Sequence, residues 1–567
     1  MTQDINFMVG GEAGQGVQSA GLLLAKAMTR WGYHTFADQD YESRIRGGHN
    51  FFRVRASQAH VQAIAEPVNI LIAFNKESVD LHRVGVVSGG AIVYDGESIK
   101  DVTGAGLVSV PAQKLAEEAG DKLMSNTVLL GAGLGLIGFD LDVLADVLRR
   151  FFSGDSGEKN VKAARAGFDH VLKGYPNTYA RKLKATNAPQ RLVLTGNDAM
   201  SLGAIAAGCK FMAAYPMTPT TSIMEYLSAK QKEYGLVVVP AEDEISAINM
   251  VVGAAYAGVR AMTATSGGGF CLMVEGLGLA GITETPIVVI EGQRAGPGIG
   301  LPTRTEQGDL EFILHAAHGE FPRAVLAPAT VEECFWLTVK AFNLADKYQM
   351  PVLVITDQHL ASSYAAIETL DLSGVTIDRG VLYDGKAQGV YKRHAYTESG
   401  ISPRAFPGKP GVLVVTDSDE HDEAGHLTED ADTRTKMMQK RMRKLYGARK
   451  EIAPPHLYGS KRAENMLIGW GSTYGALKEA ADMLRKQGVS VDVLHFSELW
   501  PFPAEPAADA MSNAQRTFVV ENNATGQLAH LIRRETGRAA TASILRYDGR
   551  PFTPAGIVRA VEKEGCR

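Results

Sequence analysis

The sequence is poor in the cysteines that iron–sulfur clusters and metal sites use. Its 567 residues include only four, Cys209, Cys271, Cys334 and Cys566, and no two of them form a CxxC pair. A protein-bound cluster needs several suitably spaced cysteines. The chain alone is therefore not expected to hold one, and its thiols are expected to be reduced and partly buried.

Excess positive charge and long apolar runs are also lacking. The net charge is −5, with an isoelectric point near 6.3, which argues against a nucleic-acid partner. No uninterrupted apolar run reaches the ~20 residues that span a bilayer, so no membrane partner is expected. The chain starts with a strand-like run at 5–9 rather than a signal peptide, so we expect a cytoplasmic location.

What the sequence has in abundance is glycine and ordinary globular composition. Sixty glycines accompany 45% hydrophobic and 21% charged residues. This composition is typical of a globular protein, and the glycines suit α/β folds with tight turns and ligand loops. The length predicts roughly three to five domains of ~100–200 residues.

Strand-like and helix-like runs alternate along most of the chain, which predicts several doubly wound α/β domains. A first α/β domain is expected at 1–182. A polar, basic linker at 183–191 separates it from a second at 192–379. Residues 380–455, rich in Gly, Pro and charge and ending in a basic helix, are expected to form an arm. A last, three-layer α/β domain is expected at 456–567.

The expected elements can be given by residue range. In the first domain they are strands 5–9, 34–37, 71–74 and 91–94, a helix at 17–30 and a helical or mixed run at 127–136. In the second they are strands 211–214, 236–239, 261–265, 287–290 and 351–355 and a helix at 199–209. In the last they are strands 466–470, 489–495, 516–521 and 543–546 and a helix at 476–487.

Four polar clusters in the second domain each follow a strand-like run. They are residues 215–221, 242–244, 265–269 and 293–298. The carboxyl ends of parallel strands meet at one edge of a sheet, where open α/β proteins bind ligands. The sequence therefore predicts a ligand site built from these four clusters.

Glu244 is the strongest candidate for chemistry in that site. A helix after Pro240 would place Glu244 on one stripe with apolar residues such as Ile248 and Val251. A carboxyl on such a stripe is desolvated and can share a proton. Thiamine diphosphate requires this property, because a glutamate bonded to its aminopyrimidine ring activates the cofactor. The alternative is an acid favoured by the helix dipole, which fits Glu242 and Asp243 better.

Arg294 and Thr218 suit the binding of a 2-oxo acid. Arg294 follows a buried-type strand, and its guanidinium can hold a carboxylate in a two-bonded fork. Thr218 lies between two prolines, in a rigid loop that fixes its hydroxyl near the same carboxylate or the ketone. The alternatives are a surface salt bridge for Arg294 and a turn-stabilising hydroxyl for Thr218.

The segment at 215–221 reads Tyr-Pro-Met-Thr-Pro-Thr-Thr and resembles the YPITPSS motif of the 2-oxoacid:ferredoxin oxidoreductases. In that family the activating glutamate lies nine residues before a helix glycine, as Glu244 lies before Gly253. The substrate arginine lies fifteen before an aspartate, as Arg294 lies before Asp309. Residues 1–182 are similar to the family's gamma unit and 192–567 to its alpha subunit. The departures, Met for Ile and Thr for Ser, are mild.

The resemblance implies a reaction and a set of cofactors. It implies oxidative decarboxylation of a 2-oxo acid with coenzyme A, giving acyl-CoA, CO₂ and reduced ferredoxin, or the reverse. Tyr215, Pro216, Gly267 and Gly268 would line the thiamine diphosphate. No GDG with a suitably spaced Asn pair occurs. A partner beta subunit would therefore carry the diphosphate–Mg²⁺ half-site and a [4Fe–4S] cluster, in a dimer of heterodimers; no metal ligand is expected in this chain.

Two features of the first domain are consistent with this interpretation and add two expected binding sites. The glycines Gly11, Gly14 and Gly16 at a helix start offer backbone N–H groups to an anion, and the resemblance links this unit to coenzyme A. Residues 43–49 resemble the family's segment that reaches the substrate pocket. A cation there, Arg46 by preference, with Arg44 or His49 as alternatives, could meet the distal carboxylate of 2-oxoglutarate. The alternative for the glycines is a tight strand–helix turn without a ligand, and the alternative for residues 43–49 is a solvated basic turn.

The function expected from these features is a subunit of a 2-oxoglutarate:ferredoxin oxidoreductase that forms succinyl-CoA. Two rival readings stay open. One keeps the chemistry and changes the substrate to pyruvate or a branched-chain 2-oxo acid, for which Arg46 would not matter. The other is a non-catalytic subunit that binds coenzyme A or a nucleotide, for which Glu244 would not matter.

Overall fold

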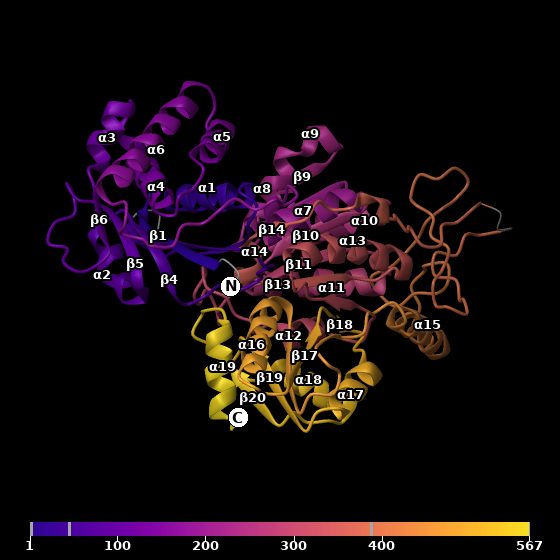
Figure 1. The fold of residues 1–567 in the computed structure, drawn as a ribbon. Coiled ribbons are helices and arrows are strands. Elements are labelled where there is room, and N and C mark those ends of the chain that lie inside the picture. Colours follow the sequence, from indigo (N-terminus) through magenta and orange to yellow (C-terminus); the bar gives the residue numbers. More distant parts are fainter. Residues whose placement is uncertain (1–3, 44–46, 386–388, 566–567) are drawn as a thin grey trace. The chain divides into compact units, whose positions relative to one another are not determined.

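The computed structural model describes residues 4–43, 47–385 and 389–565 (Figure 1). The chain divides into two compact α/β units. Unit 1 comprises Met1–Thr195, Ser362–Leu370 and Thr553–Ala555, and unit 2 comprises Gly196–Ala361, Asp371–Phe552 and Gly556–Arg567. Each unit has sheets with helices interleaved along the chain, as the sequence predicts. In the described part of the chain, no helix is both long and apolar enough to cross a membrane.

Unit 1 is built on one mixed sheet of eight strands, ordered β6-β5-β4-β1-β3-β2-β14-β7. The strands are β1 (Asp4–Ala13), β2 (His34–Asp40), β3 (Gly47–Ser57), β4 (Val68–Ala73), β5 (Val86–Asp95), β6 (Leu107–Val110), β7 (Leu192–Thr195) and β14 (Tyr364–Ile367). The four strands from β6 to β1 are parallel, and the remaining pairs are antiparallel.

The helices of unit 1 are α1 (Val17–Arg30), α2 (Lys76–His82), α3 (Ala112–Ala119), α4 (Ser125–Leu136), α5 (Leu141–Phe151) and α6 (Asp155–Gly174), with short 3₁₀ turns at Arg83–Gly85 and Lys122–Met124. Helix α1 has the predicted bounds. It packs on β1, β2 and β3, and α4 packs along α6. These contacts bury one continuous apolar core that includes Phe7, Leu24 and Leu130.

The structure differs from the expected domain boundaries at two places. Residues 192–195, expected to open the second domain, form the edge strand β7 of the unit 1 sheet, and β14 also belongs to that sheet. Residues 183–191 have no regular structure, yet Leu183 is buried and Tyr33 donates to the Lys184 carbonyl. The segment is therefore packed rather than free, because its apolar side chain and backbone find partners.

Unit 2 contains a seven-stranded sheet, ordered β18-β12-β13-β11-β10-β8-β9, parallel except at β18. Its strands are β8 (Phe211–Ala214), β9 (Val237–Pro240), β10 (Ala261–Thr265), β11 (Val288–Gln293), β12 (Ala324–Leu326), β13 (Val352–Asp357) and β18 (Glu498–Trp500). The surrounding helices are α7 (Gly196–Ala206), α8 (Thr221–Ala229), α9 (Gln231–Tyr234), α10 (Glu244–Tyr256), α11 (Gly267–Ile282), α12 (Leu310–His315), α13 (Val331–Tyr348) and α14 (Gln358–Ser362). All five predicted strands of this region are present, with bounds that differ from the prediction by at most three residues.

A five-stranded sheet, ordered β15-β17-β16-β19-β20, completes unit 2. Its strands are β15 (His456–Tyr458), β16 (Asn465–Trp470), β17 (Val491–Phe496), β19 (Arg516–Glu521) and β20 (Ala542–Leu545). Its helices are α16 (Tyr474–Lys486), α17 (Ala504–Ser512), α18 (Gln527–Thr536) and α19 (Pro554–Lys563), and 3₁₀ turns lie at Leu372–Gly374 and Gly471–Thr473. One apolar core runs through both sheets of unit 2.

The expected arm contains little regular structure before its basic helix, α15 (Ala431–Arg449). This helix is not a solvated appendage, because its Lys440 and Lys444 are 1% and 0% exposed. Both ammonium groups pair with the buried carboxylate of Glu284, which also contacts Nδ1 of His394 at 2.9 Å. These four side chains fix α15 and the arm to the end of α11.

Candidate active site

The strand order brings the four polar clusters together. Neighbouring strands β11, β10, β8 and β9 end in the clusters at 293–298, 265–269, 215–221 and 242–244, in that order. Because these strands are parallel, all four clusters lie at the same edge of the sheet. The structure thus places the predicted residues of this domain where a ligand site was expected.

Glu244 is the first residue of α10, and its side chain is only 3% exposed. The helix cap is supplied by Asp243, whose carboxylate accepts from the Ser246 N–H at 2.7 Å. Within the described residues, Oε1 of Glu244 has no hydrogen-bond partner. Capping therefore does not explain this carboxyl. A buried polar atom without a partner is costly, and its presence points to a ligand that supplies one.

A glycine turn faces this carboxyl. A Cβ added to Gly269 would lie 2.6 Å from Oε1 of Glu244 and would also overlap the Thr265 hydroxyl. Only glycine therefore fits at 269 while Glu244 keeps its position. The turn that starts α11 and the start of α10 form a close-fitting cradle around the unpartnered oxygen.

Arg294 and Thr218 are in contact with each other. The Arg294 guanidinium donates from one nitrogen to the Thr218 carbonyl at 3.0 Å. Both side chains are partly exposed. No hydrogen bond of the Thr218 hydroxyl is found within the described residues. The pair leaves further guanidinium N–H groups and a hydroxyl without a hydrogen-bond partner among the described residues, which suits a carboxylate.

The other predicted cofactor residues lie along the same edge. Tyr215 and Pro216 are exposed just after β8, and Gly267 and Gly268 start α11. The Ser266 hydroxyl lies 2.6 Å from the sulfur of Met217 and so links two of the clusters.

Two further acids of the site, Glu291 and Asp309, were given no role from the sequence. Glu291 ends the apolar run of β11 and is 0% exposed, and Asp309, which is partly exposed, is the N-cap residue of α12. Burial and the nearby charge of Asp309 raise the pKa of Glu291 well above its usual value, and burial raises the pKa of Asp309. The sequence signal that could have identified Glu291 is its position at the end of an otherwise apolar strand.

In unit 1 the predicted glycine loop is shorter than expected. Gly11 lies inside β1, and only residues 14–16 form a turn before α1. Gly14 and Gly16 have φ of 94° and 77°, and no side chain caps α1. Arg46, with Arg44, lies outside the described residues. The alternative cation, His49, lies in β3 with its Nε2 2.6 Å from Nε2 of His82.

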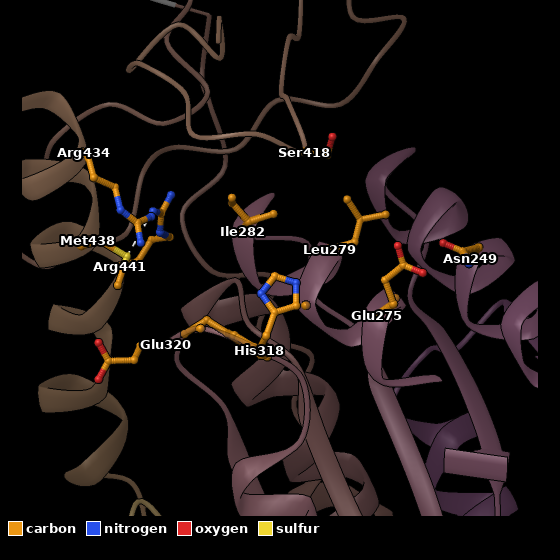
Figure 2. Close-up of a pocket in the computed structure, with 14 residues that line it drawn as sticks. Asn249, Glu275, Leu279, Ile282, His318, Glu320, Ser418, Arg434, Met438 and Arg441 are labelled. Carbon is orange, nitrogen blue, oxygen red and sulfur yellow. Dashed lines mark hydrogen bonds between the residues drawn. The ribbon is translucent and has the colours of Figure 1, made fainter. Parts of the chain in front are cut away.

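A pocket of about 450 Å³ lies on another part of unit 2 (Figure 2). It is lined by α10, α11, the loop at 318–321 and the arm, and by none of the four clusters. Its two arginines, Arg434 and Arg441, both pair with Glu420. Both guanidinium groups therefore already have a carboxylate partner, and the pocket contains none of the predicted site residues.

Fold and site together define an α/β protein of the class that binds a cofactor at the carboxyl ends of parallel strands. Residues 202–440 match the family profile "Pyruvate flavodoxin/ferredoxin oxidoreductase, thiamine diP-bdg", which identifies a thiamine diphosphate-binding domain. Residues 6–170 match "Pyruvate ferredoxin/flavodoxin oxidoreductase", and residues 463–557 match "Pyruvate:ferredoxin oxidoreductase core domain II". The chain belongs to the 2-oxoacid:ferredoxin oxidoreductase family and is similar to its alpha subunits throughout.

Individual relatives agree with the family. The 2-oxoacid:ferredoxin oxidoreductase subunit alpha of Sulfolobus sp. is 35% identical, over 99% of this chain and 96% of the relative. The 2-oxoglutarate synthase subunit KorA of Archaeoglobus fulgidus is 33% identical, over 66% of this chain and 99% of the relative. A solved structure, 2-oxoglutarate:ferredoxin oxidoreductase from Magnetococcus marinus with 2-oxoglutarate, coenzyme A and succinyl-CoA bound, is 34% identical. It covers 99% of both chains with a TM-score of 0.93.

Proposed function

We propose that the chain is a subunit of a thiamine diphosphate-dependent 2-oxoglutarate:ferredoxin oxidoreductase. The reaction converts 2-oxoglutarate, coenzyme A and oxidised ferredoxin into succinyl-CoA, CO₂ and reduced ferredoxin, and runs in either direction. The observation that carries the catalytic part is the buried, unpartnered Oε1 of Glu244 against Gly269. The choice of 2-oxoglutarate is supported by the similar solved enzyme, which holds that substrate and coenzyme A.

The residues present fit thiamine diphosphate. Glu244 would bond the aminopyrimidine ring and hold or release a proton there, and the glycine at 269 lets the turn that starts α11 lie close against this carboxyl. When bound, the cofactor supplies a carbon nucleophile for the 2-oxo carbon and takes up the electron pair left by CO₂. Arg294 would bind the carboxylate next to the ketone, and Thr218 would orient it.

The proposal includes partners and sites that other chains complete. A beta subunit would supply the diphosphate–Mg²⁺ half-site and a [4Fe–4S] cluster that passes electrons to ferredoxin, in a cytoplasmic dimer of heterodimers. The turn at Gly14 and Gly16, together with Gly11, would bind a phosphate of coenzyme A, because the start of α1 has no side-chain cap. Arg46 would meet the distal carboxylate of 2-oxoglutarate.

Substrate choice is tested by a dye-reduction assay. The chain, purified anaerobically with its partner and supplied with coenzyme A, thiamine diphosphate and Mg²⁺, should reduce dye with 2-oxoglutarate far faster than with pyruvate. Arg46→Met should raise KM for 2-oxoglutarate by about 10- to 100-fold, because a charge-assisted contact is lost. Preference for pyruvate would move the proposal to another 2-oxo acid, whereas an unaffected Arg46→Met enzyme that still prefers 2-oxoglutarate would move the role of the cation to Arg44 or His49.

Arg294→Lys should raise KM for the 2-oxo acid by about 10-fold or more and leave KM for coenzyme A unchanged. A lysine keeps the charge but cannot bond Thr218 and a carboxylate with one planar fork. Steady-state kinetics with each substrate varied in turn gives both constants. An equal rise in both KM values would instead indicate a general distortion of the site.

A further inference from the structure

Glu291 is a buried acid with no donor to satisfy it. It lies on β11, between β10 and β13, opposite Thr265 and Ile355. Its side chain is 0% exposed, and within the described residues neither carboxyl oxygen has a hydrogen-bond donor. An ionised carboxylate so placed would be strongly disfavoured. The side chain therefore needs either a proton or a ligand.

The polar group within hydrogen-bonding reach of Glu291 is another carboxyl, that of Asp309. Two ionised carboxylates are both acceptors, so their contact is a hydrogen bond only when one of them holds a proton. The surroundings favour this. Buried Asp357 on β13 and the thiol of Cys271 on α11 act on Glu291, and Glu306 interacts with Asp309. None of these groups is a cation.

The pair is in contact with the candidate site. A Cβ added to Gly267 would overlap Oδ2 of Asp309, while a Cβ at Gly269 would overlap Glu244. The turn that starts α11 thus lies between the two acids on one side and Glu244 on the other. Asp309 occupies the space that a side chain at position 267 would need, so the carboxyl lies directly against this turn.

We propose that Glu291 and Asp309 share one proton and act as positioning residues that hold the turn at 266–269 in place beside Glu244. The role in catalysis rests on the proposed function, whereas the shared proton does not. As long as the pair holds its proton, Asp309 stays bonded to Glu291. Loss of the proton leaves two buried negative charges, which repel each other and press Asp309 against Gly267.

The shared proton predicts how stability depends on pH. Folding raises the pKa of such an acid, so between the pKa of the unfolded state and that of the folded state the folded protein holds more protons. The free energy of unfolding therefore falls as the pH rises through this range. Glu291→Gln replaces the proton with a permanent N–H donor and should remove this loss. Its melting temperature should match wild type near pH 5 and exceed it by about 2–4 °C near pH 8.5.

The experiment uses the full-length chain, with no substrate, and compares wild type with Glu291→Gln, Asp309→Asn and the control Glu275→Gln. Glu275 is an exposed acid on α11. Melting temperature against pH is combined with infrared difference spectra, in which wild type should show a protonated carboxyl band that Glu291→Gln lacks. The shared proton would be contradicted if the melting temperatures of wild type and Glu291→Gln changed in parallel with pH and wild type lacked the band. It would also be contradicted if Glu291→Gln were less stable than wild type at every pH.

The positioning role is tested separately in the assembled enzyme. KM for thiamine diphosphate should rise on the alkaline side for wild type and stay flat for Glu291→Gln, while Glu291→Ala should raise it at every pH. A merely structural role predicts the same pH profile for wild type and Glu291→Gln. If the shared proton is confirmed and the enzyme is active, that result would overturn the positioning role. It would leave the shared proton and the proposed function standing.

Discussion

Replacing Glu244 with glutamine is expected to lower kcat of the assembled enzyme by about 10²–10⁴-fold, the usual contribution of a positioned acid or base. Glutamine has almost the same shape and would keep the contact with Gly269, but it cannot take up and release a proton. The variant should therefore fold and assemble normally and bind thiamine diphosphate. Single-turnover dye reduction with saturating cofactor separates the chemical step from binding.

The matched control is Glu242→Gln, which makes the same change two residues earlier at an exposed position. It should leave kcat within about twofold of wild type, as surface substitutions usually do. A fully active Glu244→Gln enzyme would remove the catalytic proposal and favour the reading of a non-catalytic subunit that binds coenzyme A or a nucleotide.

Glu284→Ala is expected to destabilise unit 2 by about 3–5 kcal/mol, because it leaves two buried ammonium groups without a counter-ion. Burial alone would raise the pKa of Glu284, but Lys440 and Lys444 outweigh it and hold that pKa well below its usual value. Burial lowers the pKa of Lys444 to about 7 even beside this carboxylate. Without this carboxylate Lys444 should release its proton at lower pH still, so the deficit should shrink as pH rises toward about 7, the wild-type pKa of Lys444.

Differential scanning calorimetry of the full-length protein measures this change. Lys444→Met should cost less than Glu284→Ala, because Lys440 still neutralises the carboxylate. Glu275→Ala on the preceding helix serves as the control and should fall within about 0.5 kcal/mol of wild type. Equal losses for Glu284→Ala and Lys444→Met would mean that packing, rather than charge pairing, holds α15 in place.

The sequence predicts the parallel parts of the fold well because each buried strand of such a sheet is a short apolar run. The strands at 211–214, 261–265 and 516–521 have the predicted bounds. Two of the missed strands give weaker signals in the sequence. β3 carries partly exposed His, Asn and Arg side chains, and β12 has only three residues. The membership of β7 and β14 in the first sheet depends on pairing between distant segments, which local pattern does not contain.

For the candidate site, the sequence indicates which residues gather but not which atoms lack partners. Strand order alone accounts for the meeting of Thr218, Glu244 and Arg294. The unpartnered oxygen of Glu244 and the fit of Gly269 become visible only in three dimensions. The Glu291–Asp309 contact joins residues eighteen positions apart through a loop whose path the sequence does not specify.

The placement of β7 and β14 in the unit 1 sheet means that no single cut yields two self-sufficient fragments. A fragment ending at residue 182 would lack both strands and expose the edge of β2, whose Phe36 and Ala37 lie opposite β14. Bare strand edges promote aggregation. The complementary fragment would carry β14 without its neighbour on the β2 side. Either piece is expected to be soluble only when the other is co-expressed. Recombinant work therefore requires the intact polypeptide or both pieces together.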